Sequence, residues 1–160
     1  MSTRITHELT YDAPASEVYK MLTNPDFREE VCARIKVIRA SATVEESAAG
    51  AVVTIDQRQH AAGLPSFAKK LTGDEIHIVQ QETWTDPSRA DVHVTIPGRP
   101  GEMVGTAVLV ETDGRTVETV DLDIRVRVPL VGGKIESLVA EMLLKALRAE
   151  NTAGRDYLSR

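Results

Sequence analysis

The 160-residue chain is poor in cysteine and has no long apolar run. Its one cysteine, Cys32, cannot form an internal disulfide, and its apolar neighbours favour a small buried side chain over a reactive thiol. No segment approaches the roughly 18 consecutive apolar residues of a membrane-spanning helix. Residues 1–10 lack the apolar core of a signal peptide. We therefore expect a cytoplasmic protein in a reducing compartment, with no stable membrane insertion.

The chain also lacks an excess of positive charge and the spacings of common catalytic or metal-binding motifs. Its net charge of -5 and isoelectric point near 5.4 disfavour a nucleic-acid partner. His60, His77 and His93 show no metal-ligand spacing, and no Gly-x-Ser-x-Gly motif is present. Gly132 and Gly133 precede a predicted helix without the other residues of a phosphate-binding loop. No metal, no cofactor and no catalytic residue is predicted.

The last quarter of the chain carries the clearest structural pattern. From Val120 to Val128 apolar residues occupy every second position and charged residues lie between them, which is typical of a half-buried strand. After Gly132 and Gly133 the period changes, and residues 135–147 carry one apolar stripe at helical spacing. The two glycines permit the turn between these elements. The pattern predicts a strand followed by a long amphipathic helix that dominates the core.

The rest of the chain predicts a strand, two short helices and a meander. Residues 5–11 alternate, Pro14 suits the start of a short helix, and Asn24 caps a second helix that begins at Pro25. Alternation then continues to the final strand, interrupted by turn residues. The six predicted strands of the meander are 37–46, 51–60, 75–85, 90–97, 102–112 and 115–129. With no linker in the chain, residues 1–160 form one predicted domain.

Hairpin turns fix the expected strand registers. Asp113-Gly114 is a two-residue turn signal that pairs Thr112 with Arg115. The turns imply these further pairs: Ala107 with Val120, Gly105 with Leu122, Met103 with Ile124, Ile96 with Met103, Val94 with Gly105, and Trp84 with Ala90. In this register one continuous apolar face results.

Polar and small residues interrupt that inner face. Polar side chains buried without partners are unfavourable, and small residues leave space, so the combination predicts a cavity. We interpret ten residues as candidates for its ligand-binding wall: His7, Gln57, Gln59, Gln80, Glu82, Trp84, Met103, Gly105, Leu138 and Met142. Each has an ordinary structural alternative, such as a hydrogen-bonded core histidine or a polar sheet rim. Residues 61–74 carry a short helical stripe that favours either a mobile lid or a helix covering one end of the sheet.

The order of elements resembles the START-like superfamily, also called SRPBCC, helix-grip or birch-pollen-allergen-like. The segments 12–31 and 128–149 are similar to a bacterial family of START-like domains of unknown function. The resemblance implies an α+β fold in which a seven-stranded curved antiparallel sheet wraps around the C-terminal helix. It carries over no catalytic residues.

Three functions remain open from the sequence. The leading hypothesis is binding, transport or sequestration of a hydrophobic or amphipathic small molecule such as a lipid, sterol or polyketide. An enzyme of the polyketide cyclase or dehydratase type would use the same cavity, with Glu82 or His7 moving a proton. A protein-interaction module would instead fill the cavity with its own side chains. The pattern does not indicate an oligomeric state.

Overall fold

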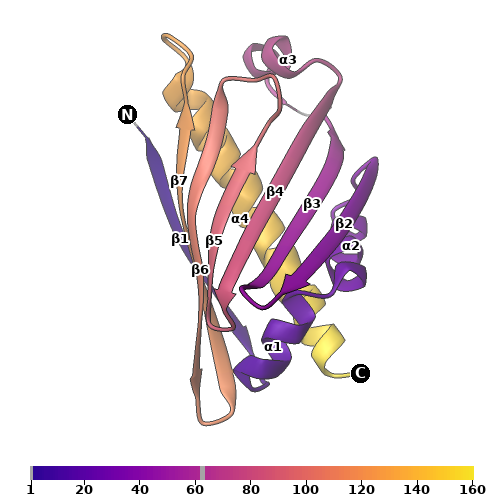
Figure 1. Ribbon diagram of the computed structural model, residues 1–160. Coiled ribbons are helices and arrows are strands. Elements are labelled where there is room, and N and C mark those ends of the chain that lie inside the picture. Colours follow the sequence, from indigo (N-terminus) through magenta and orange to yellow (C-terminus); the bar gives the residue numbers. More distant parts are fainter. Residues whose placement is uncertain (1, 62–63) are drawn as a thin grey trace.

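The computed structural model describes residues 2–61 and 64–160, and within them the chain forms one antiparallel sheet and four helices (Figure 1). Residues 62 and 63 of the predicted lid segment lie outside the described residues. The elements are β1 (Thr3–Tyr11), α1 (Ala15–Leu22), α2 (Pro25–Arg34), β2 (Arg39–Ser47), β3 (Gly50–His60), α3 (Ser66–Thr72), β4 (Glu75–Asp86), β5 (Arg89–Thr95), β6 (Gly101–Thr112), β7 (Arg115–Val126) and α4 (Gly132–Leu158). This is the predicted α+β helix-grip fold.

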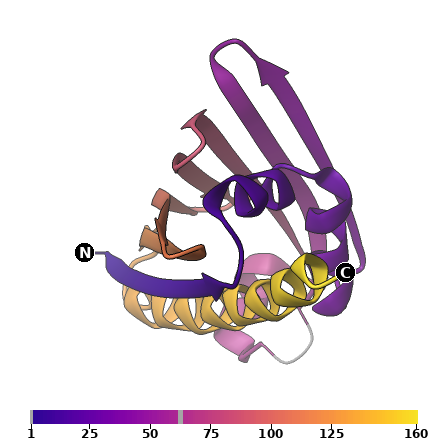
Figure 2. The same ribbon diagram turned by 90° about the horizontal axis from the view of Figure 1, so that it is seen from below.

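The seven strands follow the order β1-β7-β6-β5-β4-β3-β2. β1 therefore closes one edge of the meander by pairing with the last strand, and β2 forms the other edge. The sheet curves around α4, and α1 and α2 lie on the same side of the sheet as that helix (Figure 2). α4 packs on β1, β7, α1 and α2, while α2 also packs on β2. No helix in the described parts of the chain is both long enough and apolar enough to span a bilayer.

The helix boundaries follow local chemistry. The Asn24 side chain accepts a hydrogen bond from the backbone nitrogen of Asp26 at 2.9 Å, and Pro25 occupies the first turn, so the predicted cap of α2 is confirmed. At the start of α4, a Cβ atom on Gly132 would lie 2.7 Å from the carbonyl oxygen of Val126. Glycine at this position therefore permits the close turn from β7 into the helix.

Most predicted registers are confirmed. β6 and β7 pair Thr112 with Arg115 and continue through all the predicted β6–β7 partners, and Trp84 pairs with Ala90. The predicted β5–β6 register is wrong by two residues, because Val94 pairs with Met103 rather than with Gly105. A turn closed by a 2.9 Å hydrogen bond from the Arg99 nitrogen to the Ile96 oxygen shortens β5. A shift of two residues preserves the inner face, so the core prediction survives.

The core lies between helices α1, α2 and α4 and the sheet, all seven strands of which contribute buried apolar residues. Leu9 and Val18 are fully buried there, as are most of the apolar residues of α1. Gly154 of α4 lies against the Tyr11 ring, where an added Cβ atom would be 2.5 Å from the Tyr11 Cε1 atom. This close approach brings the C-terminal half of α4 onto β1 and leaves the space between α4, α2 and the centre of the sheet for the site described next.

Candidate functional site

A cavity of about 70 Å³ lies between α2, the middle of α4 and the concave face of the sheet. Much of its wall is apolar, including Val31, Ile55, Val92 and Leu147. The remaining wall carries six polar side chains, which are Arg28, Gln57, Gln80, Glu82, Glu118 and Glu150. A cavity of this size has room for a few water molecules or a small ligand group, whereas pockets for drug-sized ligands measure roughly 300–1,000 Å³.

Arg28 is the centre of a buried charged cluster on one side of this cavity. Its Nη1 and Nη2 atoms donate to Glu82 Oε1 and Oε2 at 3.2 and 2.6 Å, a bidentate pair, and Nη1 also donates to the Leu22 carbonyl oxygen at 3.3 Å. Nη2 lies 3.2 Å from Glu150 Oε1 on α4. Arg28 thus joins α2 to β4 and to α4, and its relative exposure is only 3%. Such pairs are strong because the guanidinium and the carboxylate match in geometry.

Glu82 has its hydrogen-bonding capacity filled. Besides the two bonds from Arg28, its Oε2 atom accepts from Gln80 Nε2 at 2.6 Å and its Oε1 atom accepts from Trp84 Nε1 at 3.2 Å. The Trp84 ring packs edge-on against the Tyr19 ring, with centroids 5.5 Å apart. The carboxylate is therefore fixed in a structural network that extends from α1 to β4.

Glu118 of β7 lines the same cavity but has no such network. It is 4% exposed, and its Oε1 atom has no hydrogen-bond partner in the described structure. The Tyr11 hydroxyl on the adjacent strand β1 is likewise buried without a partner among the described residues. Buried polar atoms without partners are uncommon in folded proteins, so this part of the wall has unused capacity for binding.

Burial and the crowding of carboxylates shift the pKa values of this cluster. Burial, reinforced by Glu150 and Glu82, holds the pKa of Glu118 well above its ordinary value. Burial also raises the pKa of Glu150, although the Arg28 charge opposes this shift. Burial alone would lower the pKa of Arg28, but Glu82, Glu150 and Glu118 outweigh it and keep the guanidinium charged. The cluster therefore favours bound protons on its surplus carboxylates.

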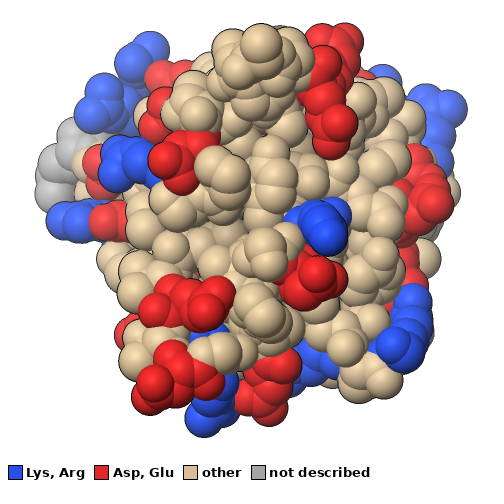
Figure 3. Space-filling view, turned by 60° about the horizontal axis from the view of Figure 1, so that its bottom comes forward, with Lys and Arg blue, Asp and Glu red and all other residues tan. Residues whose placement is uncertain are grey.

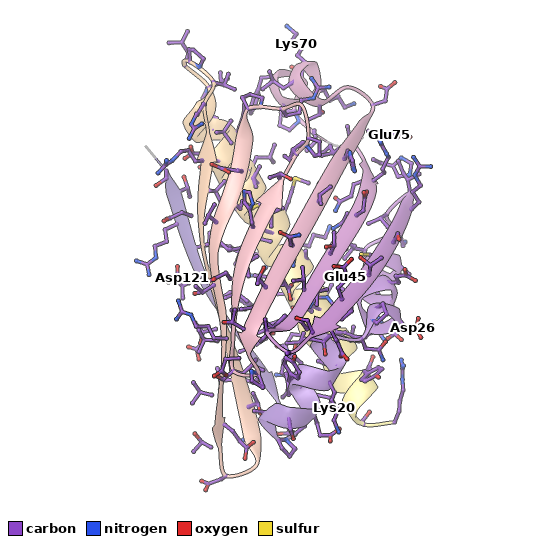
Figure 4. The ribbon with its side chains drawn as sticks, viewed as in Figure 1. Lys20, Asp26, Glu45, Lys70, Glu75 and Asp121 are labelled. Atoms are coloured by element: carbon purple, nitrogen blue, oxygen red, sulfur yellow. The ribbon has the colours of Figure 1, made fainter. Side chains whose placement is uncertain are left out.

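The cluster contrasts with the charged residues on the surface. Lys20, Lys70 and Glu75, which are labelled in Figure 4, are exposed on the surface. Acidic and basic residues are interspersed over the face shown in Figure 3, and neither sign covers it. Most surface ion pairs of this kind contribute little to stability, whereas the enclosed Arg28 cluster is shielded from water.

Of the ten predicted wall residues, Gln57, Gln80 and Glu82 line the cavity. Two others contact these residues: Gln59 Nε2 donates to Gln57 Oε1 at 3.0 Å, and Trp84 donates to Glu82 as described. The structure thus brings half of the predicted wall together on β3 and β4.

The other five predicted residues are not among the residues that line the cavity. They are His7, Met103, Gly105, Leu138 and Met142. His7 is half-buried on β1 opposite Val120. At Gly105 the small size has another cause, because an added Cβ atom would lie 1.8 Å from the carbonyl oxygen of Asp121. This glycine permits the close approach of β7 rather than opening space beneath α4.

Sequence reasoning missed three charged members of the site, although their positions carry a signal. Arg28 precedes Val31 and Cys32 by three and four residues, which places it on the buried face of α2. Glu118 lies two residues before Val120 on the inner face of β7, and Glu150 lies three residues after Leu147 on the stripe of α4. Charged residues in apolar positions were the available clue.

The predicted helical stripe in residues 61–74 corresponds to α3, which lies at one end of the sheet in Figure 1. Arg99 Nη2 donates to the Thr72 carbonyl oxygen at 3.3 Å, which connects α3 to the β5–β6 turn. No residue of this helix lines the cavity. A structural helix at the sheet end is therefore present, and the lid remains a prediction.

The described residues contain no group of His, Cys, Asp and Glu side chains arranged to hold a metal ion. Cys32 lines the cavity as a buried free thiol, and burial raises its pKa. The thiol is thus disfavoured as a nucleophile, since the thiolate is the reactive form.

Comparison with known protein families identifies the family of this chain. Residues 6–158 match the family described as "Protein of unknown function (DUF2505)". The chain belongs to this family. An uncharacterized protein of Mycobacterium tuberculosis, Rv0481c, is 26% identical over 154 residues, covering 88% of this chain and 87% of the relative. The predicted resemblance to a START-like family of unknown function is confirmed.

Solved structures of other proteins share the fold of this DUF2505 protein. The Zhui aromatase/cyclase from Streptomyces sp. R1128 superposes with a TM-score of 0.70 at 14% identity, covering 100% of this chain and 95% of the other. A START superfamily protein from Mycobacterium smegmatis superposes with a TM-score of 0.62 at 12% identity, covering 97% and 98% of the two chains. At these identities the comparison establishes the START-like fold.

Proposed function

We propose that this protein binds a small amphipathic molecule between α2, α4 and the sheet. The observation that carries the proposal is the cavity itself, in which an apolar wall faces convergent polar side chains. This combination is typical of sites that bury the apolar part of a ligand and orient its polar part. The fold shared with a START superfamily protein and an aromatase/cyclase supports the proposal.

The cavity volume limits what can be bound without rearrangement. At about 70 Å³ it accommodates a small group, and a lipid, sterol or polyketide requires α2 and α4 to separate. Several contacts hold these helices together, including a 3.0 Å hydrogen bond from Asn24 Nδ2 to the Tyr157 hydroxyl and a 2.8 Å pair between Arg34 and Asp156. We therefore propose that binding of larger ligands loosens the contacts between α2 and the end of α4.

A bound ligand can be sought directly. The purified protein is extracted with solvent for mass spectrometry and then titrated with fatty acids, sterols and aromatic polyketides, with fluorescence as the readout. Trp84 is the only tryptophan in the chain and donates a hydrogen bond to the cavity residue Glu82, so its emission reports on the site. No extracted species and no fluorescence change with any compound would refute the proposal.

A matched pair of variants on α4 tests the location. Ala146 lines the cavity, whereas Ala149 lies one turn away outside the lining. Ala146→Leu fills space that a ligand would occupy, and we expect about tenfold weaker binding, since overpacking costs about 1–3 kcal/mol. Ala149→Leu should bind as the unaltered protein does. Equal affinities for the two variants would contradict binding at this cavity.

A proton-transfer enzyme is the second candidate, and one observation favours it. Glu118 lines the cavity with an unpartnered oxygen, and its raised pKa keeps a proton available, as a general acid requires. Glu82 and His7 are less suited to this role, because Glu82 is engaged by Arg28 and His7 lies outside the lining. On any substrate found to turn over, Glu118→Gln should abolish the reaction while His7→Phe leaves it unchanged.

A further inference from the structure

The charged groups around the cavity do not balance. One guanidinium, Arg28, faces three carboxylates, those of Glu82, Glu118 and Glu150. If all four groups were ionised, the enclosed cluster would carry two surplus negative charges. A low-dielectric interior does not sustain such a surplus, so protons or another cation must neutralise it.

Arg28 is fully committed to two of these carboxylates. It forms the bidentate pair with Glu82 and lies 3.2 Å from Glu150, whereas Glu118 has no ion-pair partner in the described structure. The free Oε1 atom belongs to a side chain that is 96% buried and lines the cavity. The Tyr11 hydroxyl, on the neighbouring strand, is the other buried polar atom left without a partner among the described residues. An unsatisfied carboxylate oxygen therefore lines the cavity, and an unsatisfied hydroxyl lies on the neighbouring strand.

We infer that the polar end of the ligand is a cationic nitrogen, such as an alkylammonium group, that pairs with the carboxylate of Glu118. This inference rests on the proposed binding function and names its ligand class. An ammonium group supplies the positive charge and the hydrogen-bond donors that the cluster lacks, and its alkyl part contacts the apolar wall. An alcohol of the same shape supplies a donor without the charge.

The same geometry couples binding to a proton. In the empty cavity a proton neutralises Glu118, and an arriving ammonium replaces it, so the proton leaves to solvent while the ion pair forms. Other titratable or charged groups facing this region are Tyr11 of β1, Arg28 and Cys32 of α2, Glu82 of β4 and Glu150 of α4. One ligand cation and one proton shared by the remaining carboxylates balance the cluster. Binding therefore releases up to about one proton near neutral pH.

The experiment compares charged and neutral probes of matched shape. Methylammonium, butylammonium and benzylammonium are titrated against the corresponding alcohols by calorimetry, in two buffers with different ionisation enthalpies. We expect the amines to bind at least about tenfold more tightly and to release protons, since hydrogen bonds to charged groups contribute roughly 1.5–3 kcal/mol. Glu118→Gln should abolish both the preference and the proton release. Asp123→Asn, an exposed position on the same strand, is the control and should leave both unchanged.

The possible outcomes separate this inference from the function on which it rests. Equal binding of amines and alcohols, or an amine preference that persists in Glu118→Gln, overturns the inference. If fatty acids, sterols or polyketides bind while amines show no preference, only the cationic ligand class is rejected. If no compound of either panel binds, the binding function is rejected as well. Circular dichroism checks that Glu118→Gln is folded. We expect it to fold, because glutamine has nearly the same size and shape as glutamate.

Discussion

Replacing Arg28 by methionine should be among the most damaging single changes in this protein. The substitution keeps much of the side-chain volume but leaves Glu82, Glu150 and Glu118 around the cavity without a protein cation. Removal of one partner from a buried ion pair costs about 3–5 kcal/mol, because an uncompensated buried charge remains. The free energy of unfolding of a typical domain is about 5–15 kcal/mol, so this loss is a large share of the total stability.

Urea unfolding followed by Trp84 fluorescence and far-ultraviolet circular dichroism measures this loss. We expect Arg28→Met to lose about 3–5 kcal/mol at pH 7.5 and less at pH 5, because the surplus carboxylates gain protons as the pH falls. The control is Arg34→Met on the same helix, whose pair with Asp156 is partly exposed and contributes at most about 1 kcal/mol. If Arg28→Met does not fold, the double variant Arg28→Met/Glu82→Gln should recover part of the loss.

Two results would refute this reasoning. One is an Arg28→Met cost no larger than that of Arg34→Met, which would mean that the cluster is solvated. The other is a cost that grows on acidification, since the stated cause is charge on the remaining carboxylates. Either result would also weaken the assignment of Glu118 as an unpaired group, because that assignment depends on the same enclosure.

Three further measurements test single features. The pKa of Glu118 is raised in the folded state, so the folded protein binds more protons at this group than the unfolded chain does. The contribution of Glu118 to the free energy of unfolding should therefore fall as the pH rises above about 4.3, by up to about 1.4 kcal/mol per pH unit. In urea titrations, Glu118→Gln should flatten this decline. Gly154→Ala should reduce the free energy of unfolding by about 1–3 kcal/mol through its clash with Tyr11, and so lower the melting temperature. Gly133→Ala, where an added Cβ meets nothing within 4 Å, should raise the melting temperature. Asn24→Ala should cost about 1 kcal/mol in urea unfolding by removing the cap of α2.

Much of the fold was predictable because each element has a local pattern. The alternation of apolar residues identified β7 as a strand, and the apolar stripe identified α4 as a helix. The Asp113-Gly114 turn set the register between β6 and β7. The β5–β6 register failed because several turns can span residues 96–101, and the sequence does not select among them. That error changed which residues pair and left unchanged which face they occupy, since the shift was two residues.

The site was less predictable because it depends on contacts distant in sequence. Arg28 and Glu82 lie 54 residues apart and meet only when α2 packs over the sheet. Alternation correctly placed Gln57, Gln80 and Glu82 on the inner face. It offered no means of deciding that a helix would bring a guanidinium to Glu82, and so the network appeared as isolated polar residues. A protein-interaction module would have filled this space with its own side chains, and the cavity at this site therefore does not favour that alternative.

The energetics of the cluster argue for a functional rather than a stabilising role. A buried network with every group satisfied rigidifies a core, but this one leaves the Glu118 oxygen unsatisfied beside a cavity. Apolar residues of similar volume in place of a buried ion cluster often stabilise a protein by about 1–4 kcal/mol, so packing alone would favour their use here. Departures from well-satisfied packing are expected where a site must interact with something else. The unsatisfied carboxyl is then explained by a ligand that completes the network, which is the role that the charge imbalance assigns to a cationic nitrogen.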